Sequence, residues 1–385
     1  MMQLSREMLA KAIVSIHRFV RFSWIYGPRR AAFKAAGRLR WGRATLMSLR
    51  PWPAARDVGV IGCGQFAFAT IGYVITTRIG NCFFAHFDPD PEAARSFARF
   101  YGSRTRDSAL AAIKDKRVRT VYVASNHASH ADYAVAALEA GKDVYVEKPI
   151  AVTNQQLARL LRAREKATGR LFAGYNRPFS KAVRELKSAC GAVDGPLTLS
   201  CVVAGHVLAG GHWYRRPEEG TRICGNVGHW LDLMVHILSW RGLPKAWQIS
   251  CTWSNPSARD EDVVIALTST RGDLVSIVIT ARSEPFEGIS EQIFLQWGDV
   301  QATIDDFRRM TVHKGSRRVA RRYWPKDVGH VAAIMQPFVD ASRNFEEVVH
   351  STRLMLAITE MVSTGTRLRD FSFAAESVAA EGMQS

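Results

Sequence analysis

Residues 58–67 read Val-Gly-Val-Ile-Gly-Cys-Gly-Gln-Phe-Ala, a short apolar run followed at once by a G-x-G-x-x-A pattern. The apolar run predicts a buried strand, and the uncharged stretch after the pattern predicts the start of a helix. Gly62 permits the tight turn, Gly64 lets the backbone approach a pyrophosphate, and Ala67 lets helix and strand pack closely. The helix N-terminus then faces the phosphates. We therefore expect a dinucleotide-binding Rossmann domain.

A second strand is predicted at Cys82-Phe-Phe-Ala-His-Phe-Asp88, about twenty residues farther along the chain. A carboxylate at this position hydrogen-bonds the adenosine ribose, so Asp88 favours NAD over NADP. His86 and Arg95 nearby keep NADP open as the cofactor. The alternative role for Asp88 is to cap a helix that begins near Pro89.

Short apolar strands and helices then alternate, with strands expected at 120–124 and 143–146 and helices at 92–101 and 128–140. This order predicts a parallel, doubly wound sheet with its ligand crevice at the carboxyl ends of the strands. The expected cofactor contacts in that crevice are Gly62, Gly64, Gln65, Phe66, Ala67, Asp88, Ser125, Asn126, His127, His130, Glu147 and Lys148.

Three segments together resemble the Gfo/Idh/MocA family of NAD(P)-dependent oxidoreductases. They are the glycine loop, residues 137–149 (Ala-Leu-Glu-Ala-Gly-Lys-Asp-Val-Tyr-Val-Glu-Lys-Pro) and residues 174–177 (Gly-Tyr-Asn-Arg). The resemblance covers residues 57–370. It implies that Lys148, from Glu-Lys-Pro, contacts substrate and assists proton transfer. Independently, a lysine beside Glu147 at a strand end can stabilise a developing alkoxide, and the alternative is a solvated ion pair.

Beyond Pro178 the chain becomes rich in strands, which predicts a second domain. The resemblance implies an α/β domain with a large, open, mostly antiparallel sheet. Strands are expected at 197–206, 246–254, 262–270, 273–282, 290–297 and 300–304, and helices at 156–168, 179–189, 229–240, 330–347 and 351–365. The expected divisions are a basic extension at 1–56, the Rossmann domain at 57–177, the substrate-binding and oligomerisation domain at 178–370, and a tail at 371–385.

A second candidate site lies in Gly225-Asn-Val-Gly-His229-Trp-Leu-Asp232. The ordinary pKa of histidine suits proton transfer near neutrality, so His229 is expected to be catalytic together with Lys148, and a structural histidine is the alternative. In the resembling family an Asp often stands four residues before this histidine, where this chain has Gly225. Asn226 is expected to contact substrate, although an amide cannot act as a base.

The run 216–232 looks like the oxidoreductase half of two-domain proteins encoded with surface-polysaccharide genes, which carry Glu at the position of Asn226. Asn176 resembles a substrate-contacting position of the family, and Arg177 is suited to an anionic group. The expected substrate contacts are thus Lys148, Asn176, Arg177, Asn226 and His229.

The composition, with 47% hydrophobic and 23% charged residues, is that of a globular protein. Six cysteines without a C-x-x-C pair suggest neither a metal site nor disulfides, which favours the cytoplasm.

Residues 1–56 carry +11 of the net charge of +17. An amphipathic pattern from Met8 to Val20 predicts a helix that packs on the body or a partner, or lies on the inner membrane face; a targeting segment is a further alternative, because Arg-rich termini with few acidic residues resemble transit peptides. Nucleic acid is not expected as a partner.

These observations favour an NAD(P)-dependent dehydrogenase that transfers a hydride between a ring carbon of a sugar or nucleotide-sugar and nicotinamide, in carbohydrate or surface-polysaccharide metabolism. The resemblance also implies a homo-oligomer formed through the second-domain sheet. The alternative is a catalytically weak nucleotide-binding protein that regulates or scaffolds through its basic N-terminus, since Gly225 and Asn226 replace a carboxylate.

Overall fold

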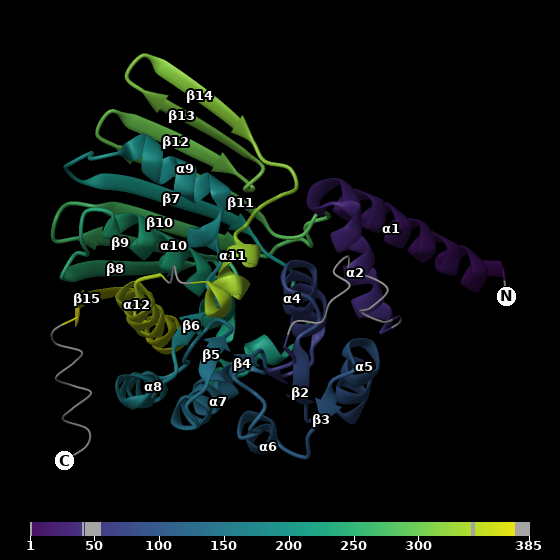
Figure 1. Cartoon of the computed structure of the whole chain (residues 1–385). Coiled ribbons are helices and arrows are strands. Elements are labelled where there is room, and N and C mark those ends of the chain that lie inside the picture. Colours follow the sequence, from purple (N-terminus) through teal and green to yellow (C-terminus); the bar gives the residue numbers. More distant parts are fainter. Residues whose placement is uncertain (1, 41, 43–54, 340–342, 374–385) are drawn as a thin grey trace.

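The strand β1 (Val58–Ile61) lies inside a six-stranded sheet with the order β3-β2-β1-β4-β5-β6. A computed structural model describes residues 2–40, 42, 55–339 and 343–373 (Figure 1). Every neighbouring pair in this sheet is parallel, and the strand order is that of the Rossmann fold. The other strands are β2 (Phe83–Phe87), β3 (Arg104–Thr105), β4 (Thr120–Val123), β5 (Asp143–Val146) and β6 (Leu171–Ala173). The predicted doubly wound sheet is confirmed.

Helices cover both faces of this sheet, which explains why β1 and β4 are buried along their whole length. The helix after β1 starts with a π-helical turn, η1 (Ala67–Ile71), and continues as α4 (Gly72–Arg78). The others are α5 (Pro91–Tyr101), α6 (Ala109–Ile113), α7 (His127–Glu139) and α8 (Asn154–Lys166). Side chains of Asp90, Ser108 and Thr153 cap three of them by accepting backbone N–H bonds.

The second sheet has nine strands in the order β14-β13-β12-β11-β7-β10-β9-β8-β15. β7 and β10 pair in parallel and the other neighbours are antiparallel, so the mostly antiparallel sheet is confirmed. The strands are β7 (Leu197–Ala204), β8 (Ala246–Trp253), β9 (Val263–Ser269), β10 (Leu274–Thr280), β11 (Ser290–Trp297), β12 (Val300–Asp305), β13 (Arg309–Lys314), β14 (Arg317–Arg322) and β15 (Leu368–Ser372).

Residues of this sheet alternate between buried and more exposed positions, because helices cover one face only. The covering helices are α9 (Lys181–Cys190), α10 (Gly228–Ser239) and α12 (Phe345–Thr364), seen in front of the strands in Figure 1. On the open face, Val278 of β10 lies in register between Val202 of β7 and Val264 of β9.

Two sequence predictions were wrong in this half. The continuous helix expected at 330–347 is instead α11 (His330–Met335) and a 3-10 turn, η6 (Gln336–Phe338), and α12 starts only at Phe345. Pro337 lacks an N–H and clashes with the preceding turn, so the helix cannot continue through it. The last strand also runs past the expected tail boundary at 370, because Phe371 is buried beside β8.

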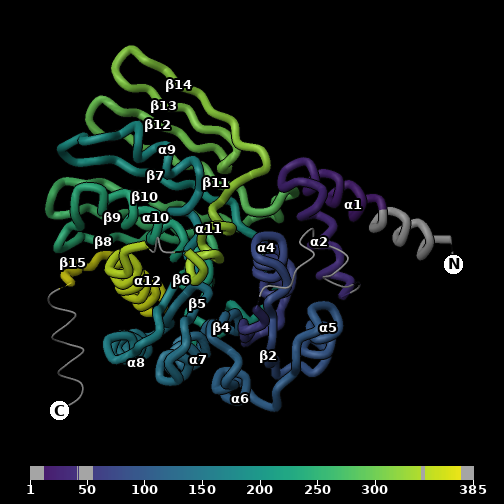
Figure 2. The backbone as a smooth tube through the Cα atoms, viewed as in Figure 1, coloured from purple at the N-terminus to yellow at the C-terminus, as the bar shows by residue number. Residues whose placement is uncertain are grey.

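Two helices of the N-terminal extension, α1 (Met2–Tyr26) and α2 (Pro28–Leu39), form a hairpin, and the turn between them is purple in Figure 2. They turn at Gly27, whose φ of 88° suits glycine. Phe33 and Ala36 of α2 are buried against the Rossmann domain. Residues 43–54 of the extension lie outside the described residues. In the part of the chain that the structure covers, no helix is both long and apolar enough to cross a bilayer.

Candidate functional site

The glycine loop between β1 and the following helix has one crowded and one open glycine. Gly62 has a φ of 89°, and a Cβ there would lie 2.5 Å from the carbonyl oxygen of Ala124. A Cβ on Gly64 would meet nothing within 4 Å. Gly62 is therefore required by the fold, whereas Gly64 borders free space at a helix N-terminus. This open cradle fits the pyrophosphate of a dinucleotide.

Asp88, which follows the end of β2, is hydrogen-bonded to the glycine loop. Its Oδ2 accepts a hydrogen bond of 2.6 Å from the backbone N–H of Cys63, and its Oδ1 accepts one of 2.8 Å from Asp90. Each carboxylate oxygen retains a second lone pair that can accept from a ribose hydroxyl. The cap of α5 is Asp90, which accepts from Glu92 N–H, so Asp88 does not fill that role.

A cleft of about 560 Å³ runs over the glycine loop and the carboxyl ends of the parallel strands. All the expected cofactor contacts except Ala67 line this cofactor cleft. Ala67 is instead buried in the contact between helix and sheet, the place that its small side chain suits. The cleft lies where the strand order reverses, which is the usual dinucleotide position in this topology.

The two histidines after β4 are held by backbone carbonyls. The nitrogens of His130 lie 2.8 Å from the carbonyl oxygen of Pro149 and 3.0 Å from that of Ser125. Nδ1 of His127 lies 3.0 Å from the carbonyl oxygen of Glu219, and burial lowers the pKa of His127 to about 2. His127 is therefore neutral at physiological pH. Both rings are already partnered within the fold.

A segment of the second domain lies across the cofactor cleft, which the sequence did not predict. The buried Glu219 of the turn η4 (Pro217–Glu219) accepts from the Asn126 amide at 2.7 Å and from the N–H of Ala128 at 3.0 Å. Trp213, in the turn η3 (Trp213–Arg215), stacks edge-on against His127 with ring centroids 4.6 Å apart. These contacts couple the Rossmann domain to the chain that leads into α10.

A hydrogen bond from Lys148 joins the two predicted site segments, Glu-Lys-Pro and the stretch from Gly225 to Asp232. Its Nζ donates a hydrogen bond of 2.7 Å to the carbonyl oxygen of Gly225, in the π-helical turn η5 (Ile223–Val227). A Cβ at Gly225 would lie 2.5 Å from the ring of Tyr214. The aromatic ring thus fills the space that a carboxylate side chain at position 225 needs.

Glu147, the neighbour of Lys148 in the chain, is buried. The hydroxyl of Tyr145 donates a 2.7 Å hydrogen bond to its Oε1. Burial raises the pKa of Glu147 to about 7, against the opposing effects of Tyr145 and Lys148. Lys148 therefore faces the cleft beside a carboxyl group whose charge is weakened by desolvation.

A second cavity of about 640 Å³, here called the outer cavity, contains His229, Asn176 and Arg177. Nδ1 of His229 is buried and has no hydrogen-bond partner among the described residues. Burial lowers the pKa of His229 well below its ordinary value, and the charges of Arg177 and Lys148 add to this effect. The unsatisfied nitrogen of this neutral imidazole can accept a proton, but the lowered pKa makes it a weaker base than the ordinary histidine pKa expected from the sequence.

The other expected substrate contacts differ in their availability. The Asn176 amide donates a 2.6 Å bond to the carbonyl of Val328. Arg177 forms a buried, two-pronged ion pair with Glu291, so its charge is already balanced. Asn226 is partly buried in η5 and lines neither the cofactor cleft nor the outer cavity.

Two further groups near the site serve the fold. Asp232, one turn after His229, is fully buried and accepts from Arg343 at 2.6 Å and Ser351 at 3.0 Å. Its carboxylate therefore ties α10 to α12.

All six cysteines are buried free thiols. Within the described ranges, no group of three or more His, Cys, Asp or Glu side chains is arranged to hold a metal ion.

Comparison with known proteins agrees with this geometry. Residues 56–175 match the family model GFO_IDH_MocA, described as an oxidoreductase family with an NAD-binding Rossmann fold. Inositol 2-dehydrogenase of Pseudomonas syringae is 35% identical over 191 residues, which cover 48% of this chain and 53% of that protein. Inositol 2-dehydrogenase 3 of Saccharopolyspora erythraea is 34% identical over 149 residues, covering 38% and 44%. The chain thus spans about half the length of the curated relatives it matches.

Solved structures extend the likeness in fold to the second domain. GenD2 from gentamicin A biosynthesis, solved in complex with NAD, superposes with a TM-score of 0.68 at 18% identity, covering 85% of this chain and 99% of that one. An NAD binding oxidoreductase from Klebsiella pneumoniae gives 0.66 at 17% identity, covering 83% and 99%. The Rossmann strand order, the open glycine loop and the Glu-Lys-Pro lysine thus occur together in one chain, and residues 56–175 match the NAD-binding Rossmann domain of the Gfo/Idh/MocA oxidoreductases.

Proposed function

We propose that the protein is an NAD(P)-dependent dehydrogenase or reductase that acts on a CH–OH group of a sugar, a nucleotide-sugar or a related cyclic polyol. The observation that carries the proposal is the bond from Lys148, in the cofactor cleft, to Gly225, four residues before His229 of the outer cavity. This bond ties a cation of the cofactor cleft to the turn η5, which leads directly into the helix that carries the neutral imidazole. The curated relatives are named for inositol, a cyclic polyol, which supports this substrate class.

The chemistry divides between the cofactor and the protein. A bound nicotinamide supplies the acceptor or donor of the hydride. Lys148 holds the reacting hydroxyl and stabilises the negative charge that develops on its oxygen. His229, neutral because it is desolvated, takes the hydroxyl proton during oxidation and returns it during reduction. Asn176, next to Val328, lies on the wall of the outer cavity where it can orient another hydroxyl.

Asp88 supports NAD as the preferred cofactor. Its carboxylate lies at the end of β2, bonded to the glycine loop, where a 2′-phosphate would meet a like charge. Calorimetric titration with NAD and NADP tests this preference. We expect NAD to bind at least about tenfold more tightly, which corresponds to about 1.4 kcal/mol. Equal affinities would argue against the role of Asp88.

The reaction itself is tested by absorbance at 340 nm with NAD or NADP and a panel of cyclic polyols, sugars, sugar phosphates and nucleotide-sugars. Lys148→Ala should lose turnover, and Lys181→Gln is the matched control because Lys181 is an exposed cation on α9. Loss of turnover in both variants, or in neither, would contradict the assignment of Lys148. A substrate found among nucleotide-sugars would support a role in surface-polysaccharide metabolism.

The open face of the large sheet supports a homo-oligomer. Val202 and Val264 are 47% and 40% exposed and flank Val278 across three strands. Apolar residues in such a row are costly to leave in water, and a second copy of the sheet can cover them. Light scattering measures the mass, and Val202→Lys should shift an oligomer towards smaller species.

A second candidate function rests on α1. Four apolar residues of this basic helix are exposed: Ile13 (58%), Ile16 (63%), Val20 (47%) and Trp24 (73%). Such a helix can contact a partner or an anionic membrane face in a protein that regulates or scaffolds rather than catalyses. Flotation with phosphatidylserine vesicles tests this role. The free, buried thiols support a cytoplasmic compartment for either function.

A further inference from the structure

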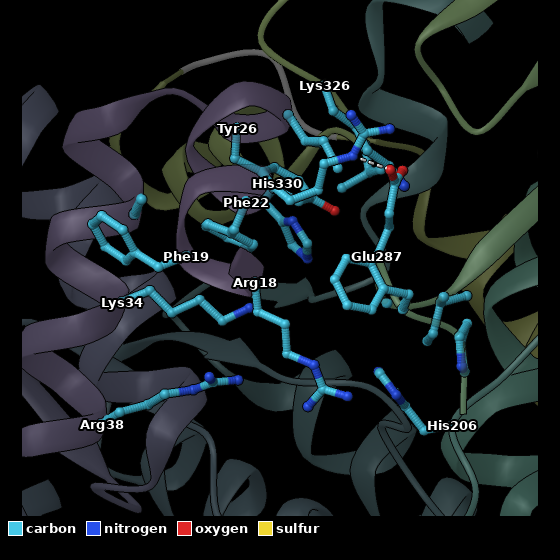
Figure 3. A pocket seen from close by; sticks show the side chains of 18 of the residues that line it. Arg18, Phe19, Phe22, Tyr26, Lys34, Arg38, His206, Glu287, Lys326 and His330 are labelled. Carbon is cyan, nitrogen blue, oxygen red and sulfur yellow. Dashed lines mark hydrogen bonds and ion pairs between the residues drawn. The ribbon is translucent and has the colours of Figure 1, made fainter. Parts of the chain in front are cut away.

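The outer cavity is walled partly by the N-terminal hairpin. α1 and α2 face His229, Asn176 and Arg177 across this space. The hairpin therefore lies opposite the residues proposed to bind substrate, although it is far from them in the sequence. Figure 3 shows side chains from both sides of the space, with Arg18, Lys34 and Arg38 reaching in from the hairpin.

The hairpin is anchored to both halves of the protein. At the end of α1, the carbonyl oxygen of Ile25 accepts a 2.8 Å hydrogen bond from the N–H of Lys326, in the segment before α11. On the other side, Arg40 donates to the carbonyl of Cys63 at 2.9 Å. A Cβ at Gly37 would lie only 2.9 Å from the Cβ of Ala69. The hairpin is thus a built wall of the cavity.

The carboxylates that line the outer cavity all have partners. Glu284 pairs with His206 at 2.7 Å. Glu287 pairs with Arg21 and Arg308, and Glu291 holds Arg177. Glu287 and Glu291 are therefore balanced by arginines, whereas Glu284 pairs with a histidine, which is charged only when protonated, and also feels the charge of Arg18.

The positive charge of the outer cavity is only partly balanced by ion pairs. Lys326 pairs with Asp306, but Arg18, Lys34 and Arg38 form no ion pair with any described residue. The Lys34 ammonium lies 3.9 Å from the centre of the Phe22 ring. Burial, together with the neighbouring charges of Arg38 and Arg30, lowers the pKa of Lys34 to about 8. Lys34 and Arg38 thus share one cavity wall without a carboxylate partner among the described residues, and beside them Arg18 helps to lower the pKa of Glu284.

We propose that Arg18, Lys34 and Arg38 bind the phosphate of a phosphorylated sugar or polyol, with its ring turned towards His229. The inference deepens the proposed function and rests on it for the ring. Phosphate fits because its oxygens accept several charge-assisted hydrogen bonds and its double negative charge balances more than one cation. A cavity of about 640 Å³ is also of the size that holds small ligands. A phosphomonoester and a nucleotide diphosphate ester offer the same chemistry here.

The test measures binding and turnover separately in the full chain. Calorimetry follows inorganic phosphate, glucose 6-phosphate and UDP-glucose, with glucose as the neutral probe, in the wild type and in the double variant Lys34→Gln/Arg38→Gln. Arg318→Gln is the matched control, because Arg318 is an exposed cation on β14. The two ester probes distinguish a phosphomonoester from a nucleotide diphosphate ester as the preferred ligand.

We expect at least one phosphorylated probe to bind the wild type and the control equally. The double variant should bind it at least about tenfold more weakly, with NAD affinity unchanged. Unchanged phosphate affinity in the double variant, or no binding of any phosphorylated probe to the wild type, would overturn the inference. Turnover of neutral polyols should be kept by the double variant, because they carry no phosphate, and its loss there would contradict a role confined to phosphate binding. Phosphate binding without turnover of any substrate would instead count against the proposed function alone.

Discussion

The Nζ of Lys148 lies 2.7 Å from the carbonyl oxygen of Gly225 and so joins the end of β5 to the turn before α10. Both predicted catalytic segments therefore meet at one point. Replacing Lys148 with Met removes the cation and keeps the length of the side chain. We expect kcat to fall by about 100-fold or more, because the hydroxyl loses its positioning and charge stabilisation. Steady-state kinetics measure this loss, and thermal melting shows whether the fold survives.

The two glycines of the nucleotide loop should respond differently to alanine. Gly64→Ala adds a methyl group to open space, so the protein should melt at an unchanged temperature but bind NAD at least about tenfold more weakly. Gly62→Ala should lower the melting temperature itself, because its Cβ would collide with the backbone of Ala124. Calorimetry and thermal unfolding separate the two effects. Normal NAD binding by Gly64→Ala would contradict the proposed pyrophosphate position.

We expect Arg40, at the end of the hairpin, to affect the affinity for NAD. Its guanidinium donates to the carbonyl of Cys63 and lies 4.8 Å from the centre of the Phe68 ring. Arg40→Gln removes both contacts next to the glycine loop. We expect the Kd for NAD to rise about three- to tenfold, with kcat at saturating NAD changed by less than about twofold. An unaltered Kd would show that the loop keeps its shape without α2.

The free energy of unfolding should decrease in acid because of His86. This side chain is fully buried between Ser103 and the carbonyl of Ala94. Burial lowers the pKa of His86 from 6.5 to about 4. Between these values the unfolded chain binds a proton that the folded chain does not, so lowering the pH from 7 to 5 should cost about 2 kcal/mol.

Urea unfolding at pH 7 and pH 5 checks this value in the wild type and in His86→Gln, which cannot titrate in this range. The variant should lose about 2 kcal/mol less than the wild type over the same interval. Equal losses in the two proteins would show that the pKa of His86 is not lowered by folding.

The Rossmann half was predictable because its signals are local. The turn at Gly62, the alternation of strands with helices, and a carboxylate at Asp88 each leave a pattern within a few residues. The break in the helix expected at 330–347 also has a local signal, Pro337, which the periodic apolar pattern around it masked.

The walls of the two cavities were not predictable in this way. Glu219 and Tyr214 reach the cofactor cleft from the second domain, and no periodicity marks a residue that acts through such a distant contact. The amphipathic pattern of the extension predicts a helix, but it does not say which surface the helix covers. Only the folded chain places Lys34 and Arg38 opposite His229.

The central claim is that this protein moves a hydride with the help of Lys148. It is tested most directly by the change in absorbance at 340 nm for the wild type and Lys148→Met, each shown by calorimetry to bind NAD equally well. We predict that the wild type turns over at least one cyclic polyol, sugar or sugar ester, and that the variant is slower by about 100-fold or more. Equal rates in the two proteins, or no turnover by a wild type saturated with NAD, would contradict the account.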